Sequence, residues 1–148
     1  MLQRIQTLFF TVALIFALLP LFGITLFSLN LMKEEITVDA FKVNGLQDAQ
    51  GHYFWIVLSA AVLLLILTIF SFKNRKTQIK LAWASLVLLF VLTGWMLVAV
   101  FFNPIFAAAE KSLGLGSIAL IVSIPCIYLG IRGVKKDQAL IDSLNRLR

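Results

Sequence analysis

The sequence has little charge, one cysteine and one histidine, and each of these shortages excludes a class of protein. Only 14% of its 148 residues are charged, compared with about 25% in an ordinary soluble domain. The single cysteine, Cys126, cannot form an intrachain disulfide or a two-thiol redox pair. The single histidine, His52, excludes a metal site built from several histidines. We therefore predict no metal site and no cofactor.

Apolar residues fill the sequence instead, at 61% of the chain. A chain this short cannot bury so much apolar surface in one globular core, because small domains leave much of their surface exposed. The excess must face lipid, so we predict an integral membrane protein. A spanning helix needs about 20 apolar residues to cross the hydrocarbon core. Four runs approach or exceed that length: 8–29, 54–72, 82–102 and 115–131. The predicted fold is an all-α antiparallel bundle of four transmembrane helices, forming a single membrane domain over residues 1–148.

The distribution of Lys and Arg orients this bundle. Ten of the thirteen basic residues lie before the first span, in the 73–81 loop or in the 132–148 tail. Only Lys33, Lys42 and Lys111 lie in the other two loops, 30–53 and 103–114. Because cytoplasmic loops carry the excess of basic residues, we predict that both termini are cytoplasmic. We also expect the first span to be an uncleaved anchor.

The segments between the spans carry weaker signals. Ile36–Ala40 alternates apolar and polar residues, and Asn44–Gly45 is a hairpin turn signal, so we predict a short β-ribbon in the first outer loop. The second outer loop is expected to break at Pro104 and continue as a short interfacial helix. The 132–148 tail has apolar residues at helical spacing, which predicts an amphipathic cytoplasmic helix.

Packing between the helices is expected to use small residues, because lipid removes most of the hydrophobic drive for helix association. The candidates are Ala13, Ala17, Ser59, Ala60, Gly94, Ala99, Gly116, Ala119 and Ser123. Pro20 and Pro125 are expected to kink the first and fourth helices. Gly114 and Gly116 are expected to let the chain turn into the fourth span.

Catalysis and ion coupling have few candidate residues. The central parts of the four spans contain no ionisable side chain, which argues against an ion-coupled transporter. The hydroxyls inside the spans are expected to bond back to their own helices. His52, near Asp48, Glu34 and Glu35, is the one candidate acid–base group, and we predict no enzymatic activity. The basic loop lacks aromatic stacking platforms, so we expect no nucleic-acid binding.

Three stretches carry a family resemblance. They are residues 1–8 (MLQRIQTL), 72–79 (FKNRKTQI) and 132–148, which begins RGVKKDQAL and ends NRLR. These resemble the small four-pass inner-membrane proteins of Bacteroidetes that are grouped as a domain of unknown function. The resemblance implies a location in the bacterial inner membrane and implies no activity. All three stretches are predicted to lie on the cytoplasmic side, where they could form one surface.

The leading hypothesis is a non-enzymatic accessory or scaffold subunit that presents this cytoplasmic surface to a larger inner-membrane complex or to anionic lipid head groups. The predicted contact residues are Arg4, Lys73, Arg75, Lys76, Lys80, Lys135, Lys136 and Arg146. The alternatives are a small oligomeric transporter or channel, and an interfacial lipid-modifying enzyme that acts through His52. Homo-oligomers are compatible with all three.

Overall fold

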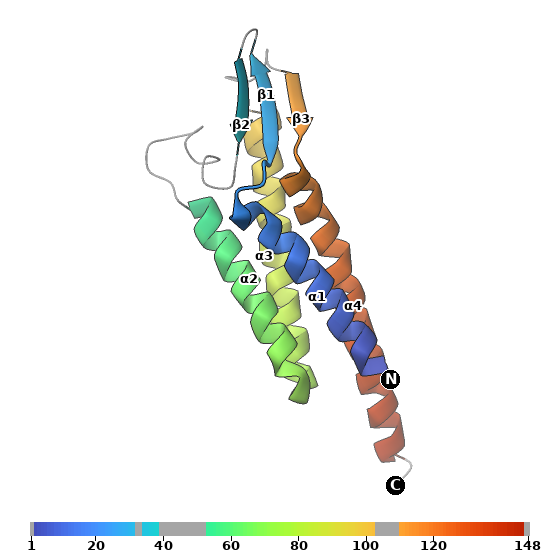
Figure 1. Ribbon diagram of the computed structural model, residues 1–148. Helices are drawn as coiled ribbons and strands as arrows, with labels where there is room; N and C mark the ends of the chain where they lie inside the picture. The colour runs from blue at the N-terminus through green and yellow to red at the C-terminus, as the bar shows by residue number, and fades with distance from the viewer. Residues whose placement is uncertain (1, 32–33, 39–52, 103–109, 147–148) are drawn as a thin grey trace.

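Four helices run side by side and a small sheet stands at one end of them (Figure 1). The computed structural model describes residues 2–31, 34–38, 53–102 and 110–146. The helices are α1 (Leu2–Leu18), α2 (Tyr53–Phe70), α3 (Arg75–Phe101) and α4 (Leu115–Arg146). Two short 3₁₀ turns follow the first two helices, η1 (Leu19–Phe22) and η3 (Ser71–Lys73). The strands are β1 (Phe27–Leu31), β2 (Glu34–Val38) and β3 (Glu110–Leu113).

Three of these helices are long and apolar enough to cross a membrane: the Ile5–Phe22 stretch, α3 and the Leu115–Ile141 part of α4. The apolar part of α2, Phe54–Phe70, is shorter. Many large apolar side chains, such as Leu8, Leu63 and Phe90, lie exposed on the helices, as expected of a surface that faces lipid. The prediction of a mostly helical, membrane-associated chain agrees with this structure.

The predicted first span over 8–29 is wrong at its carboxyl end. The α-helix stops at Leu18, and Pro20 lies in the 3₁₀ turn that follows. Proline lacks the N–H group that continues an α-helix, and Gly23 then adopts a left-handed conformation with φ 80°. The chain becomes a strand at Phe27, so Pro20 lies where the helix ends and not at a kink within it.

The sheet has three antiparallel strands in the order β2-β1-β3. β1 and β2 form the ribbon that the sequence predicts, but it begins earlier, at Phe27, and pairs Leu31 with Glu34. The predicted turn at Asn44–Gly45 lies outside the described residues. β3 replaces the end of the predicted interfacial helix, and residues 103–109 are not described. Phe27 and Leu29 are buried beneath the sheet, and the opposed Ser28 and Ser112 hydroxyls share a hydrogen bond.

Lys111 joins the sheet to the carboxyl end of α3. Its Nζ donates a hydrogen bond to the carbonyl oxygen of Phe101 at 3.1 Å and lies 5.6 Å from the centre of that ring. The Phe101 ring also contacts the Phe27 ring edge-on at 6.3 Å. A cation is favourable at this position because the last carbonyl groups of a helix carry partial negative charge. Lys111 therefore fixes the sheet to the bundle.

Replacing Lys111 with Met should lower the free energy of unfolding by about 1 kcal/mol, because the helix-end and ring contacts of the ammonium group are lost. Lys111→Arg, which keeps the cation, should retain most of the stability. Unfolding of the purified protein in mild detergent, followed by circular dichroism, measures both variants. Equal stability of Lys111→Met and the unsubstituted protein would show that this contact contributes nothing.

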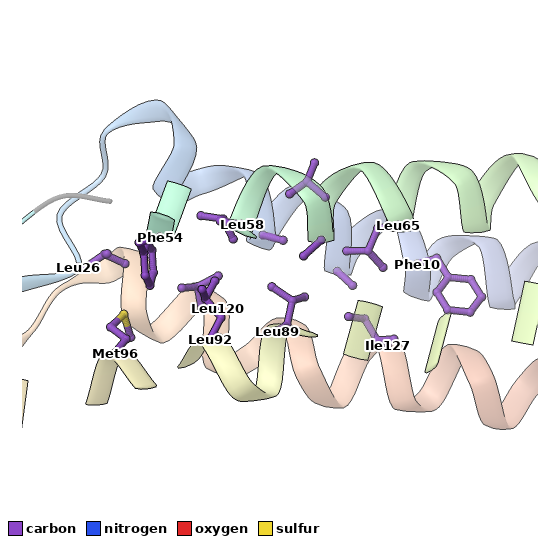
Figure 2. Close-up of a cluster of buried hydrophobic side chains, with 14 of the residues drawn as sticks. Phe10, Leu26, Phe54, Leu58, Leu65, Leu89, Leu92, Met96, Leu120 and Ile127 are labelled. Carbon is purple, nitrogen blue, oxygen red and sulfur yellow. The ribbon is translucent and has the colours of Figure 1, made fainter. Parts of the chain in front are cut away.

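The core lies between the helices and beneath the sheet (Figure 2). Phe10, Leu58, Leu89 and Ile127 are among its fully buried side chains. Of the predicted small packing residues, Ala13, Ala17, Ala99, Gly116, Ala119 and Ser123 are buried as expected. Gly94 and Ala60 are exposed instead, so their assignment to helix contacts was wrong. Gly130 was missed, and an added Cβ there would lie 2.7 Å from the ring of Phe10.

Helix α4 runs without interruption for 32 residues, or about 48 Å. It contains Pro125 and continues as far as Arg146, so the predicted amphipathic helix of the tail is an extension of the fourth helix. The predicted 73–81 loop is likewise shorter than expected, because α3 already begins at Arg75. Charged residues mark where a helix leaves lipid, but they do not end the helix.

Candidate functional site at the end of the bundle opposite the sheet

The three segments with the family resemblance lie at the same end of the bundle, which we call the distal end. It comprises the amino end of α1, the η3–α3 junction and α4 beyond Arg132 (Figure 1). All eight predicted contact residues belong to these segments: Arg4 in α1; Lys73 in η3; Arg75, Lys76 and Lys80 in α3; and Lys135, Lys136 and Arg146 in α4. The structure describes the side chains of five of them and is silent on those of Arg4, Lys73 and Arg146.

The described cations of the distal end lie mostly in solvent. Lys76, Lys80, Lys135 and Lys136 are exposed, and Arg75 is half-buried. None of the five forms an ion pair with another described residue. Lys135 extends along α4 to α3, where its Nζ lies 5.4 Å from the centre of the Trp83 ring. This cation–π contact ties the two helices together at the base of the bundle.

The distal end also contains buried polar side chains, which sequence reasoning missed. Gln6, Gln78 and Asp137 are 7%, 5% and 7% exposed. Within the described part of the chain, none of these three side chains forms a hydrogen bond. Arg75 contributes a buried Nη1 that has no hydrogen-bond partner. A fully buried polar atom is costly to leave unsatisfied, so Nη1 of Arg75 is the group at this end that would gain most from a ligand or ordered water.

Two glycines of α4 allow α1 to approach closely here. An added Cβ at Gly133 would lie 2.8 Å from Cγ of Gln6, and one at Gly130 would overlap the Phe10 ring. Asp137 lies one turn beyond Gly133, toward the amino end of α1. A carboxylate at that position is favourable because helix amino ends carry partial positive charge. We therefore interpret Asp137 as stabilising α1 and not as part of a catalytic pair.

The hydroxyl side chains described inside the bundle do not form a recognisable catalytic or metal site. The hydroxyls of Thr68, Ser85, Ser117 and Ser123 donate to carbonyl groups of their own helices, as the sequence predicted. Thr93 is the exception, because its buried Oγ1 has no partner. No group of three His, Cys, Asp or Glu suited to a metal ion occurs among the residues described. His52 and its proposed carboxylate neighbours fall outside the described side chains.

A groove of 250 Å³ lies between α2 and α3 near the sheet. Its lining is apolar and consists of Phe54, Val57, Leu88, Val91, Leu92 and Trp95. The Phe54 and Trp95 rings stack at its edge with their centres 6.2 Å apart. The indole of Trp95 is the single polar group among these lining side chains, so the distal end remains the stronger candidate.

Comparison with known families supports the resemblance carried by the three sequence stretches. A family model, described as a domain of unknown function (DUF4293), matches residues 2–147. The chain belongs to the DUF4293 family. No curated protein and no solved structure shows a significant match to it. The DUF4293 match covers all four helices and the sheet. The restriction to Bacteroidetes that the resemblance implied stays a prediction.

Proposed function

We propose that this DUF4293 protein crosses the bacterial inner membrane four times, with both termini in the cytoplasm. In this proposal it is a non-enzymatic accessory subunit whose distal end binds an acidic surface of a larger membrane assembly. The observation that carries the proposal is the set of exposed lysines at the distal end, which have no described acidic partner.

The sheet supports four spans through a parity argument. β1 follows α1 and β3 precedes α4, and these two strands pair with each other. They must therefore lie on the same side of the membrane. The chain between them passes through α2 and α3, so if α3 crosses the membrane, α2 must cross it as well. With η3 extending it, the 18-residue α2 is just long enough, since its α-helical part alone spans about 27 Å.

The charge distribution supports the orientation. The amino end of α1 and the carboxyl end of α4 lie at the same end of the bundle (Figure 1). Both termini therefore share one compartment under this proposal. That end carries ten of the thirteen basic residues. The excess of Lys and Arg in cytoplasmic segments then favours a cytoplasmic distal end.

Helix α4 projects from the bundle, which favours binding to a protein partner over lying on the lipid surface. Its last turns continue the helix beyond the amino end of α1 (Figure 1). Leu140 and Ile141 are exposed on this projecting part, next to the exposed Lys135 and Lys136. An acidic partner with an apolar patch would complement both kinds of side chain.

The test is purification of the tagged protein from its native membrane in mild detergent, followed by mass spectrometry. The Lys76→Gln/Lys136→Gln variant should lose a stoichiometric partner that the unsubstituted protein retains, by about tenfold at low salt. Lys33→Gln/Lys42→Gln removes the same charge from the opposite side and should retain the partner. Equal retention by the two variants, or no stoichiometric partner in either, would contradict the proposal.

A further inference from the structure

The amino end of α3 lacks the features that normally complete a helix start. Arg75 is its first residue, and the preceding Asn74 makes no side-chain capping hydrogen bond. The first turn contains no acidic residue, although carboxylates are favoured there, and it carries Arg75 and Lys76 instead. The first N–H groups of a helix have no partner within it. This end of α3 is therefore electropositive from both backbone and side chains.

Two polar side chains at this helix start have no hydrogen-bond partner among the described residues. Nη1 of Arg75 is buried and has no hydrogen-bond partner. Gln78, one turn along, is only 5% exposed and makes no side-chain hydrogen bond within the described residues. Helical side chains lean toward the amino end of their helix, so the Gln78 amide is directed toward the turn that contains Arg75. Because Arg75 and Gln78 are three residues apart, their hydrogen-bond donors lie on one face of α3.

The exposed residues before α3 indicate the depth of this location in the membrane. Phe70 is 73% exposed and Phe72 is 47% exposed. In the proposed orientation these rings face lipid, which places the next residues at the boundary between acyl chains and head groups. The Lys135–Trp83 contact lies about 12 Å along α3 from Arg75, and Lys and Trp side chains collect in the membrane interface. The start of α3 is therefore level with lipid phosphates.

From these observations we propose that the start of α3 binds the phosphate group of an anionic membrane phospholipid. Arg75 and the Gln78 amide donate to its oxygens, and the free helix N–H groups and Lys76 add positive potential. A guanidinium group matches phosphate geometry, and helix amino ends are ready-made anion sites. Arg75 and Asp137 form no ion pair, so the Asp137 carboxylate does not compete with phosphate for the guanidinium group. This proposal rests on the membrane orientation proposed above and adds a specific ligand at the same distal end.

The test uses the purified protein in mild detergent and measures its thermal stability with added phosphatidylglycerol, phosphatidylcholine or inorganic phosphate. Phosphatidylglycerol should raise the unfolding temperature most, and Arg75→Gln should weaken its apparent affinity about tenfold. Arg132→Gln is the matched control, since Arg132 is exposed on α4 and carries the same charge. Arg75→Lys keeps the charge but loses the guanidinium fork, so it should also bind more weakly than the unsubstituted protein.

Equal weakening by Arg75→Gln and Arg132→Gln would overturn the site, because the lipid would then respond to overall charge. Unchanged affinity in Arg75→Lys would overturn the guanidinium contact. Protection by inorganic phosphate that matches or exceeds that of the lipid would overturn the lipid as the source. Gln78→Leu, which cannot donate, provides a second readout if Arg75→Gln does not fold. Loss of the protein partner in a Lys80→Gln/Lys136→Gln variant, which leaves Arg75, Lys76 and Gln78 unchanged, with lipid protection intact would separate this site from partner binding.

Discussion

Gly114→Ala should destabilise the protein by about 3 kcal/mol, the largest effect expected from adding a single methyl group. The N–H of Gly114 donates to the carbonyl oxygen of Leu26 at 2.8 Å, and Gly116 donates to that of Thr25 at 2.9 Å. An added Cβ at Gly114 would overlap the Thr25 carbonyl group and lie 2.9 Å from the Leu26 carbonyl oxygen. Both obstacles are backbone atoms, so the strand entering the sheet would have to move and lose these hydrogen bonds.

Gly94→Ala is the matched control, because this glycine lies within α3 and nothing approaches within 4 Å of an added Cβ. Alanine is favoured over glycine inside a helix, so this variant should be more stable by about 0.5–1 kcal/mol. Unfolding in detergent, followed by circular dichroism, compares both variants with the unsubstituted protein. If Gly114→Ala matched Gly94→Ala in stability, the close contact between β1 and the start of α4 would not contribute to folding.

The helical part of the fold was predictable because composition and length are strong signals in a membrane protein. The apolar runs at 54–72 and 82–102 coincide closely with α2–η3 and with most of α3. The first run was misread beyond Pro20, since Phe27–Leu31 is apolar enough to continue a span. Its alternation of Phe27 and Leu29 with Ser28 and Asn30 was the signal for a strand, and the total hydrophobicity concealed it.

The third strand could not be predicted from local pattern. β3 is four residues long and pairs with β1 across about 80 positions of sequence, so its stability comes from distant partners. Gly114 and Gly116 were assigned to a turn, whereas their role is to let two backbones approach. Only the position of the residue 24–26 backbone reveals that requirement.

Only the basic residues of the candidate site were predictable from the sequence. The basic residues of the distal end follow from charge counting, and the structure brings their helices together. The buried polar residues Gln6, Gln78 and Asp137 were not predicted from the sequence. One signal was available: Gln78, Ala82, Ser85 and Leu89 share one face of α3, and that face is buried. Each of the three buried polar residues comes from a different one of the segments that carry the family resemblance.

The pairing of β1 with β3 and the position of the distal end together restrict the number of membrane crossings. The sheet ties β1 to β3 at one end, and the distal end gathers the start of α1, the start of α3 and the end of α4. If α3 crosses the membrane, only an even number of crossings between β1 and β3 satisfies both. The short helix α2 therefore decides whether the chain crosses the membrane four times.

Single cysteines introduced at three exposed positions should give an all-or-none test of this topology. In a Cys126→Ser background, Glu110→Cys marks the sheet, Asn74→Cys marks the α2–α3 connection and Ser143→Cys marks the end of α4. A charged, membrane-impermeant maleimide should label only Glu110→Cys in spheroplasts, because the bilayer excludes charged reagents. The other two should react only after permeabilisation.

Each alternative gives a different labelling pattern, so the experiment distinguishes them. External labelling of both Asn74→Cys and Glu110→Cys would mean that neither α2 nor α3 crosses, since the β1–β3 pairing forbids one crossing without the other. External labelling of Asn74→Cys and Ser143→Cys but not Glu110→Cys would invert the orientation. The basic distal end would then face away from the cytoplasm, and both the acidic partner and the lipid site proposed for the cytoplasmic leaflet would be wrong. Labelling of Glu110→Cys alone would leave α2 as a true span, because Asn74 lies directly after it.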